Sequence, residues 1–512
     1  MNAPVSALVA SLAVREGYRD HYWDSTDPIA DDRLLWRAQS IRHTAHVLPG
    51  QTILELGAGS GRFTRALQRV VRGENPLTAV SFRTLPAARG GTVVEGLKLE
   101  ELPGPLAGRQ FDCIVMMDLL DRENCAELLG IVHGLLKPGG ELITYESNPW
   151  NPVHKFRWVL SRIFGRKDPR YLINQTKLYE QMSEIGFVRV YAVFNDFVFP
   201  PLTGRLIWLL RNLSILLENS PGLRRMAGSI LLHAQKPPRE KAPPSLSLCR
   251  HAALRGTVSV VIPCRNEDMN IGLLVRALIT LYGDYLREIV TVDDGSTDQT
   301  RQVMAELAAG DSRVRPLIRV PPHGVGHAIR EGLRAAQGEW ILTMDCDFQH
   351  LLPEFRDLFD HANANWDVVV GSRFSRHSVL LNYPFLKILA NRAFHSLARL
   401  FLGVRCRDLT NNLKLMRRTV VAELDLRQPG FAVNAETGFL PVLRGYRVKE
   451  VPISWINRTP GMGVSSFKLA RVGGGYWEVL RDLWRSRISA RGPYRRLRER
   501  KPSVVSTATL PP

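Results

Sequence analysis

The segment GEWILTMDCDFQH, from Gly338 to His350, contains the residues with the clearest capacity for chemistry. Its apolar part predicts a strand, and Asp345, Asp347 and Gln349 follow at alternate positions. Alternate residues of an extended chain point to the same side, so three oxygen ligands would face one space. Oxygen ligands of this kind suit Mg2+ or Mn2+ bridging a diphosphate, where the cation offsets the charge that develops on a leaving group.

Two further polar clusters follow strand-like runs in the same half of the chain. The run TVSVVIP ends at Pro263 and opens into a loop with Glu267, and the run REIVTV is followed by Asp293 and Asp294. In an open α/β sheet, the carboxyl ends of the strands meet at the edge where ligands bind. We expect these clusters to meet a nucleoside there, while each cluster alone is also compatible with ordinary turn chemistry.

A glycine-rich turn is the candidate site of the first half. In ILELGAGSGRFTRAL, Glu55 lies in an apolar run, and Gly57, Gly59 and Gly61 precede a segment of helical period. Glycines at such a turn let the backbone approach a ligand closely, and the helix that follows offers free amide groups. Two further strand-like pieces, FDCIVMMDLLDRE and LLKPGGELITYES, follow in the same half of the chain.

The elements that must position these residues follow from hydrophobic patterning. Short Val/Ile-rich runs alternate with longer segments of helical period in both halves, which predicts an α/β fold with parallel sheets covered by helices. The predicted strands are Thr52–Leu56, Cys113–Met117 and Glu141–Glu146 in the first half, and Val258–Ile262, Ile289–Val292, Trp340–Met344 and Asp367–Val370 in the second.

Length and composition predict two domains. The chain has 512 residues, whereas single cores stop growing at roughly 250 to 300 residues. We expect a first domain at 1–236 and a proline-rich, charged linker at 237–256. A second domain at 257–484 precedes an arginine-rich tail at 485–512, which we expect to be disordered.

The formal net charge of +19 calls for an anionic partner. No zinc-finger spacing, basic region with heptads or aromatic RNA-binding signature is present, so we do not expect nucleic acid as that partner. An anionic membrane surface and phosphate-bearing substrates remain. The six cysteines lack any C-x-x-C spacing, which indicates free thiols in a reducing cytoplasm. No apolar run reaches 18 uncharged residues, so we expect no membrane span.

With these motifs, the second half resembles glycosyltransferase family 2 and, within it, the polyprenyl-phosphate (dolichyl-phosphate type) mannosyltransferases. The resemblance covers about Thr257 to Gly473 and includes GVGHAIREGLRAAQGEW, DCDFQH, VVVGSRF, RDLTNNLKLMRR and NRTPGMGVSSFK. It implies a GT-A type fold and the inverting transfer of a mannose-like sugar from a nucleotide-diphosphate sugar to a polyprenyl phosphate.

The resemblance also implies roles for individual residues. The nucleotide would be held by Pro263, Glu267 and Asp294, the Mg2+ or Mn2+ ion by Asp345, Asp347 and Gln349, and the diphosphate and acceptor phosphate by Arg373, Arg458 and Lys468.

Two classes of acceptor stay open. A lipid phosphate is already ionised at neutral pH and attacks without losing a proton, so it requires no general base. A glycan or protein hydroxyl would instead need a carboxylate to accept its proton, for which Asp347, Asp408 and Glu436 are the candidates.

The first half resembles class I S-adenosylmethionine-dependent methyltransferases, which have a Rossmann-like fold. The resemblance implies that Glu55 and the three glycines surround the methionine end of the cofactor. The acidic residue that would hold the ribose hydroxyls after the second strand is replaced by Ser81 or a neighbour, a loss of about 1.5 to 3 kcal/mol of binding. A methyltransferase and a non-catalytic binding module are therefore both open for this half.

One helical segment predicts contact with a membrane. The sequence PFLKILANRAFHSLARLFLGV places Lys387, Arg392 and Arg399 beside an apolar face. An ordinary helix packed on the sheet explains the pattern equally well. Together with the basic tail, the segment favours peripheral attachment to the inner face of the membrane.

Overall fold

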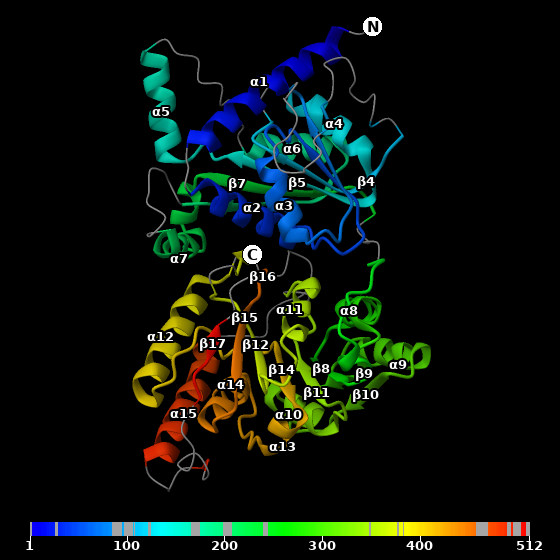
Figure 1. The fold of residues 1–512 in the computed structure, drawn as a ribbon, viewed down its shortest axis with the longest axis vertical. Coiled ribbons are helices and arrows are strands. Elements are labelled where there is room, and N and C mark those ends of the chain that lie inside the picture. Colours follow the sequence, from blue (N-terminus) through cyan, green and yellow to red (C-terminus); the bar gives the residue numbers. More distant parts are fainter. Residues whose placement is uncertain are drawn as a thin grey trace. The chain divides into compact units, whose positions relative to one another are not determined.

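The computed structural model describes residues 3–25, 29–83, 95–96, 106, 108–120, 124–164, 175–197, 207–238, 244–347, 350–375, 378–381, 383–456, 469–488, 493–494 and 503–507. The chain divides into two compact units, residues 1–245 and 246–512. Each unit is built on a sheet with helices around it (Figure 1), which confirms the predicted α/β class.

A seven-stranded sheet forms the centre of the first unit, in the order β3-β2-β1-β4-β5-β7-β6. The strands from β3 to β5 are parallel, and β7 is antiparallel to both β5 and β6. The order reverses between β1 and β4, which is where open α/β sheets bind ligands. The strands are β1 (Ile53–Leu56), β2 (Leu77–Ser81), β3 (Glu95–Gly96), β4 (Phe111–Met117), β5 (Leu136–Ser147), β6 (Val188–Asn195) and β7 (Ser229–Gln235), and the three predicted strands are confirmed as β1, β4 and β5.

The helices of the first unit bury apolar stripes against this sheet. In α3, Phe63, Leu67 and Val70 are buried at helical spacing, while Arg65 and Arg69 are exposed on the other side. The described helices are α1 (Ala3–Ser25), α2 (Ala30–Thr44), α3 (Arg62–Val71), α4 (Cys125–Leu135), α5 (Pro152–Ile163), α6 (Gln175–Ile185) and α7 (Ile207–Glu218).

The second unit has an eight-stranded sheet in the order β10-β9-β8-β11-β14-β12-β15-β17 and a separate pair, β13-β16. In the large sheet only β14 is antiparallel to its neighbours, β11 and β12. The strands are β8 (Val258–Cys264), β9 (Leu286–Asp293), β10 (Val314–Ile318), β11 (Trp340–Thr343), β12 (Val368–Ser372), β13 (Leu380–Leu381), β14 (Lys414–Arg417), β15 (Val448–Pro452), β16 (Trp455–Ile456) and β17 (Ser506–Thr507), so all four predicted strands are confirmed.

Helices cover both faces of this sheet, and each face has its own core. Val260 and Val261, successive residues of β8, belong to opposite cores because successive side chains of a strand alternate between faces. Helices α12 and α15 lie side by side (Figure 1). The described helices are α8 (Asp268–Tyr282), α9 (Thr300–Gly310), α10 (Val325–Ala335), α11 (Phe355–Phe359), α12 (Phe385–Leu402), α13 (Arg418–Glu423), α14 (Val433–Leu443) and α15 (Leu469–Ile488).

Two stretches that we expected to be linker or tail contribute to the second unit. Leu248 and Leu254, within the expected linker, are buried in one of its cores. Within the expected tail, Tyr494 is buried, and Ser506 pairs with Lys449 of β15. Composition alone predicts that these stretches are exposed to solvent. The few apolar residues that pack against the core of the second unit stand among prolines and arginines in the sequence.

Candidate active site

A cavity of about 730 Å3 opens at the carboxyl edge of β8, β9 and β11. Parallel pairing of β8 with both β9 and β11 brings the polar clusters that follow these strands to the same edge. The sequence-predicted residues that line the cavity are Pro263, Glu267, Asp294, Asp345, Asp347 and Arg373. Gln349, Arg458 and Lys468 lie outside the described residues.

Asp345 and Asp347 follow β11 directly and face the cavity. The Asn412 side chain donates a hydrogen bond of 2.8 Å to Asp345 Oδ1 and thereby orients that carboxylate. Within the described residues, no group of three or more His, Cys, Asp or Glu side chains could hold a metal ion unaided. The donor set nevertheless fits Mg2+ or Mn2+, because one or two carboxylates together with substrate phosphates are a usual Mg2+ site.

The neighbouring carboxylates Asp293 and Asp294 differ in their surroundings. Asp294 lines the cavity, and its side chain accepts hydrogen bonds from Gly324 N at 2.7 Å and from Arg319. Asp293 is fully buried and is not among the cavity-lining residues. Burial opposes its ionisation, but hydrogen bonds from Ser296 and Arg301 lower the pKa of Asp293 below its usual value. Asp293 therefore shapes the loop from which Asp294 reaches the cavity.

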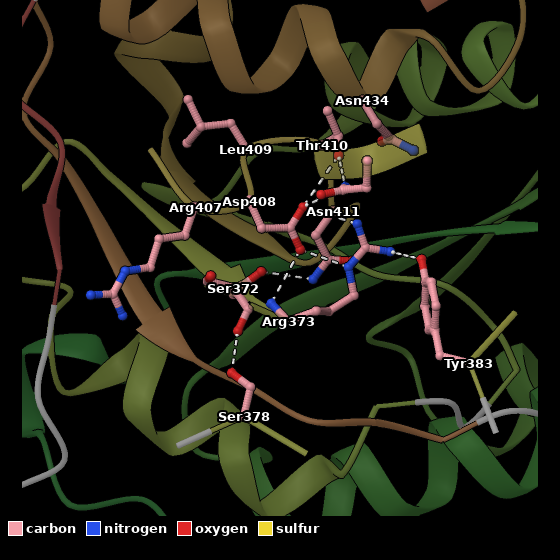
Figure 2. Close-up of polar contacts among 12 residues, drawn as sticks. Ser372, Arg373, Ser378, Tyr383, Arg407, Asp408, Leu409, Thr410, Asn411 and Asn434 are labelled. Carbon is pink, nitrogen blue, oxygen red and sulfur yellow. Dashed lines mark hydrogen bonds and ion pairs between the residues drawn. The ribbon is translucent and has the colours of Figure 1, made fainter. Parts of the chain in front are cut away.

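Arg373 lines the cavity and pairs with a carboxylate from another part of the chain, Asp408 (Figure 2). Its Nε and Nη2 atoms donate to the two oxygens of Asp408 at 2.7 and 3.0 Å, and Nη1 donates to the Tyr383 hydroxyl at 3.1 Å. Burial opposes ionisation of Asp408, but the guanidinium holds the pKa of Asp408 well below its usual range. Most donors of Arg373 are thus already used.

The loop that follows Asp408 is fixed by a buried lysine. Lys414 Nζ donates to the carbonyl oxygens of Asn411 and Asn434, and burial lowers the pKa of Lys414 to about 7. The Asn411 amide donates to Gly371 O at 2.8 Å. As a result, Asn411 and Asn412 line the cavity, and the polar run TNNLK within the motif RDLTNNLKLMRR corresponds to this loop.

The first turns of α12 also reach the cavity. Lys387 and Asn391, four residues apart, both line it. Burial and the nearby Arg373 lower the pKa of Lys387. Arg392 turns inward, with its guanidinium 3.9 Å from the centre of the Phe374 ring. The cationic helix face predicted from the sequence is therefore wrong for Lys387 and Arg392, because the fold places Lys387 in the cavity wall and Arg392 against the Phe374 ring.

Part of the cavity lining is apolar. It is contributed by Ala393, Phe394 and Leu397 of α12 and by Tyr476 and Trp477 of α15. The cavity is therefore lined both by carboxylates and by apolar side chains of two neighbouring helices.

Glu436, the third candidate base, is held by hydrogen bonds in the interior of the second unit. Its carboxylate accepts hydrogen bonds from Arg427 N and Gln428 N at 3.0 and 3.1 Å and from the Tyr494 hydroxyl at 2.5 Å. It is fully buried and is not among the residues that line the cavity.

In the first unit, the glycine-rich turn lies between β1 and α3, and Gly57, Gly59 and Gly61 have φ angles of 75°, 54° and 71°. Burial raises the pKa of Glu55 to about 7. The turn is covered by α1, whose Arg19 donates to Gly57 O. The groups that would hold the methionine end of S-adenosylmethionine are thus engaged by the chain itself, and the residues do not fit that cofactor as they lie here.

Comparison with known proteins defines the class of the second unit. A model of Glycosyl transferase family 2 matches residues 259–425. The polyprenol monophosphomannose synthase of Mycolicibacterium smegmatis is 30% identical over 244 residues, which are 46% of this chain and 91% of that protein. The dolichyl-phosphate hexose transferase of Haloferax volcanii is 30% identical over 204 residues, 39% of this chain and 83% of that protein. The chain therefore belongs to glycosyl transferase family 2 through its second unit, and it is a glycosyltransferase.

Solved structures match the chain more distantly. The glucosyl-3-phosphoglycerate synthase of Mycobacterium tuberculosis, in a complex with Mn2+, UDP and glucosyl-3-phosphoglycerate, is 22% identical and covers 44% of this chain and 78% of its own. The TM-score of this match is 0.34.

Proposed function

We propose that the second unit transfers a mannose-like sugar, with inversion, from a nucleotide-diphosphate sugar to a polyprenyl phosphate. The observation that carries this proposal is one cavity lined both by Asp345 and Asp347 and by apolar side chains of α12 and α15. A substrate pair with one highly charged and one lipid partner matches these two kinds of lining.

The carboxylate-bearing part of the lining would take the nucleotide sugar. Pro263, Glu267 and Asp294 are the proposed contacts to the nucleotide, and Asp345 and Asp347 would hold Mg2+ or Mn2+. When bound, the cation would neutralise charge on the diphosphate leaving group. Gln349 is a further proposed ligand, and Arg458 and Lys468 are proposed contacts to the phosphates.

The acceptor phosphate would lie near Lys387, with Arg373 as a further proposed contact. The amide of Asn391 lines the same part of the helix. An ionised phosphate needs no general base. A hydroxyl acceptor would need a general base. Asp408 is paired with Arg373, and Glu436 is buried and accepts hydrogen bonds from backbone amides. The remaining candidate, Asp347, is a proposed ligand of the cation. The lipid phosphate is therefore the better-supported acceptor.

The test is an assay with purified protein, Mn2+, a panel of labelled nucleotide sugars and either a polyprenyl phosphate or a glycan acceptor. Label extracted into the organic phase, and only with the lipid phosphate present, is the expected result. Label transferred to the glycan and retained in the aqueous phase would contradict the lipid acceptor.

Replacing Lys387 with alanine is expected to raise KM for polyprenyl phosphate and to lower kcat/KM by about 10- to 100-fold, because a charge-assisted hydrogen bond contributes about 1.5 to 3 kcal/mol. Lys387→Arg keeps the charge and should recover most of the loss. Arg399→Ala, an exposed change on the same helix, is the control. Equal kinetics in Lys387→Ala and Arg399→Ala would exclude Lys387 from acceptor binding.

Helix α5 of the first unit is a better candidate than α12 for contact with an anionic membrane. Val153, Phe156, Val159 and Ile163 occur at helical spacing and are 41 to 69% exposed. The segment Pro152–Ile163 also carries three basic residues and no acidic one. Aromatic, apolar and basic residues combined in this way are typical of helices that lie in the membrane interface. None of the described helices combines the length and apolarity that a membrane crossing demands.

The double variant Phe156→Glu with Ile163→Glu is expected to lose most of its co-flotation with vesicles containing anionic lipid. Met269→Glu with Leu273→Glu introduces the same charges at exposed apolar positions of α8 and should float like the unmodified protein. Undiminished flotation of the α5 variant would contradict attachment through this helix. Attachment to the inner face of the membrane is the arrangement that we propose.

A further inference from the structure

Three charged residues of α1 lie on one face of that helix and contact three different parts of the crevice edge in the first unit. Glu16, Arg19 and Asp20 are separated by three and four residues, the spacing of one helical face. All three are buried. Each contacts backbone or side-chain groups at the carboxyl ends of the strands, where a ligand of such a sheet would lie.

Glu16 lies at the end of β2. Its carboxylate accepts hydrogen bonds from Ser81 Oγ at 2.5 Å and from Phe82 N at 2.7 Å. The sequence lacks an acidic residue after this strand, and the structure supplies one from α1 instead.

Arg19 and Asp20 bind the glycine-rich turn itself. The Arg19 guanidinium donates to Gly57 O and to Met117 O, the latter at 3.3 Å. Asp20 Oδ2 accepts a hydrogen bond from Ser60 N at 2.9 Å. Arg19 thus places a cation on two carbonyl oxygens, and Asp20 places a carboxylate on a backbone amide. The ammonium and carboxylate groups of an amino-acid zwitterion would make the same polar contacts at these positions.

The space above the turn is filled as well. A side-chain carbon added at Gly59 would lie 2.3 Å from Asp20 Oδ2, so the absence of a side chain makes room for α1. Glu55, which precedes the turn, is buried as well, and the positive charge of Arg19 acts on its carboxylate.

We propose that the Glu16–Asp20 turn of α1 is an internal ligand that closes this crevice in competition with S-adenosylmethionine. Leu8, Val9 and Leu12 anchor the preceding part of α1 in the core of the unit, so the closed form is the ground state. A ligand that binds only the open form has an apparent Kd raised by the inverse of the open fraction. Binding of the cofactor by this unit is then expected to be weak, because α1 occupies the site. The proposal is independent of the sugar-transfer reaction.

The test is isothermal titration of the full chain with S-adenosylmethionine, comparing the unmodified protein with the double variant Arg19→Ala, Asp20→Ala. We expect the variant to bind saturably and at least about tenfold more tightly, since releasing a competing internal ligand raises the open fraction. In the unmodified protein, near-saturating S-adenosylmethionine should increase hydrogen exchange in the peptide that contains residues 16–20.

Val14→Ala with Tyr18→Ala changes exposed positions of the same helix and should leave the affinity unchanged. If the double alanine variant loses its helical circular dichroism, Asp20→Asn, which preserves side-chain volume, takes its place. Equal affinity in variant and unmodified protein, or no saturable binding by a folded variant, would overturn the proposal.

Discussion

Alanine in place of Asp345 or of Asp347 is expected to lower kcat for sugar transfer by on the order of 1,000-fold, equivalent to about 4 kcal/mol of transition-state stabilisation. Both carboxylates face the cavity directly after β11. Removing either would take away one of the proposed protein ligands of the cation. The charge on the departing diphosphate would then lose much of its compensation.

The measurement is initial-rate kinetics across a Mn2+ titration, with isothermal titration of Mn2+ in the presence of nucleoside diphosphate as a readout independent of turnover. Glu306→Ala removes an exposed carboxylate of α9 and should leave both readouts unchanged. Near-normal turnover and Mn2+ binding in both aspartate variants would refute the metal assignment.

The second large effect concerns the stability of the second unit. Asp408→Ala is expected to destabilise it by about 3 to 5 kcal/mol, because removing one partner of a buried ion pair leaves the other charge uncompensated. Asp408 is fully buried and accepts two hydrogen bonds from the Arg373 guanidinium. Urea denaturation followed by tryptophan fluorescence measures the change.

Asp425→Ala breaks the Arg427–Asp425 pair, in which both side chains are about half exposed, and should cost about 0 to 1 kcal/mol. The double variant Arg373→Met, Asp408→Leu separates stability from function: we expect it to regain most of the stability, since apolar replacements of buried pairs are often neutral, but not the activity. A loss below about 1 kcal/mol in Asp408→Ala would show that the pair does not hold the cavity wall.

The Arg373–Asp408 pair also predicts how the stability of the second unit depends on pH. Arg373 holds the pKa of Asp408 below its unfolded value, so the unfolded state binds the proton more readily. The stabilisation is therefore fully present above the unfolded pKa of about 3.9 and is lost only as the pH falls below it, toward the folded-state pKa.

The sequence alone determined which polar residues follow the parallel strands. Pro263, Asp294, Asp345 and Asp347 were assigned to one edge because the period of a strand is two and parallel strands end together. The same local rules correctly predicted all seven strands that we named. They did not distinguish Asp293 from Asp294, since the orientation of two adjacent carboxylates depends on which distant donors meet them.

Tertiary structure alone decided the partners of the remaining charged groups. Nothing near Arg373 in the sequence indicates that Asp408 will occupy its guanidinium, and helical periodicity assigned Lys387 and Arg392 to a solvent face although the fold turns both inward. Glu16 likewise supplies a carboxylate to a strand 65 residues further along. Local backbone geometry carries the periodicity of a strand or helix, whereas the pairing of buried charges depends on long-range packing, which a linear pattern does not encode.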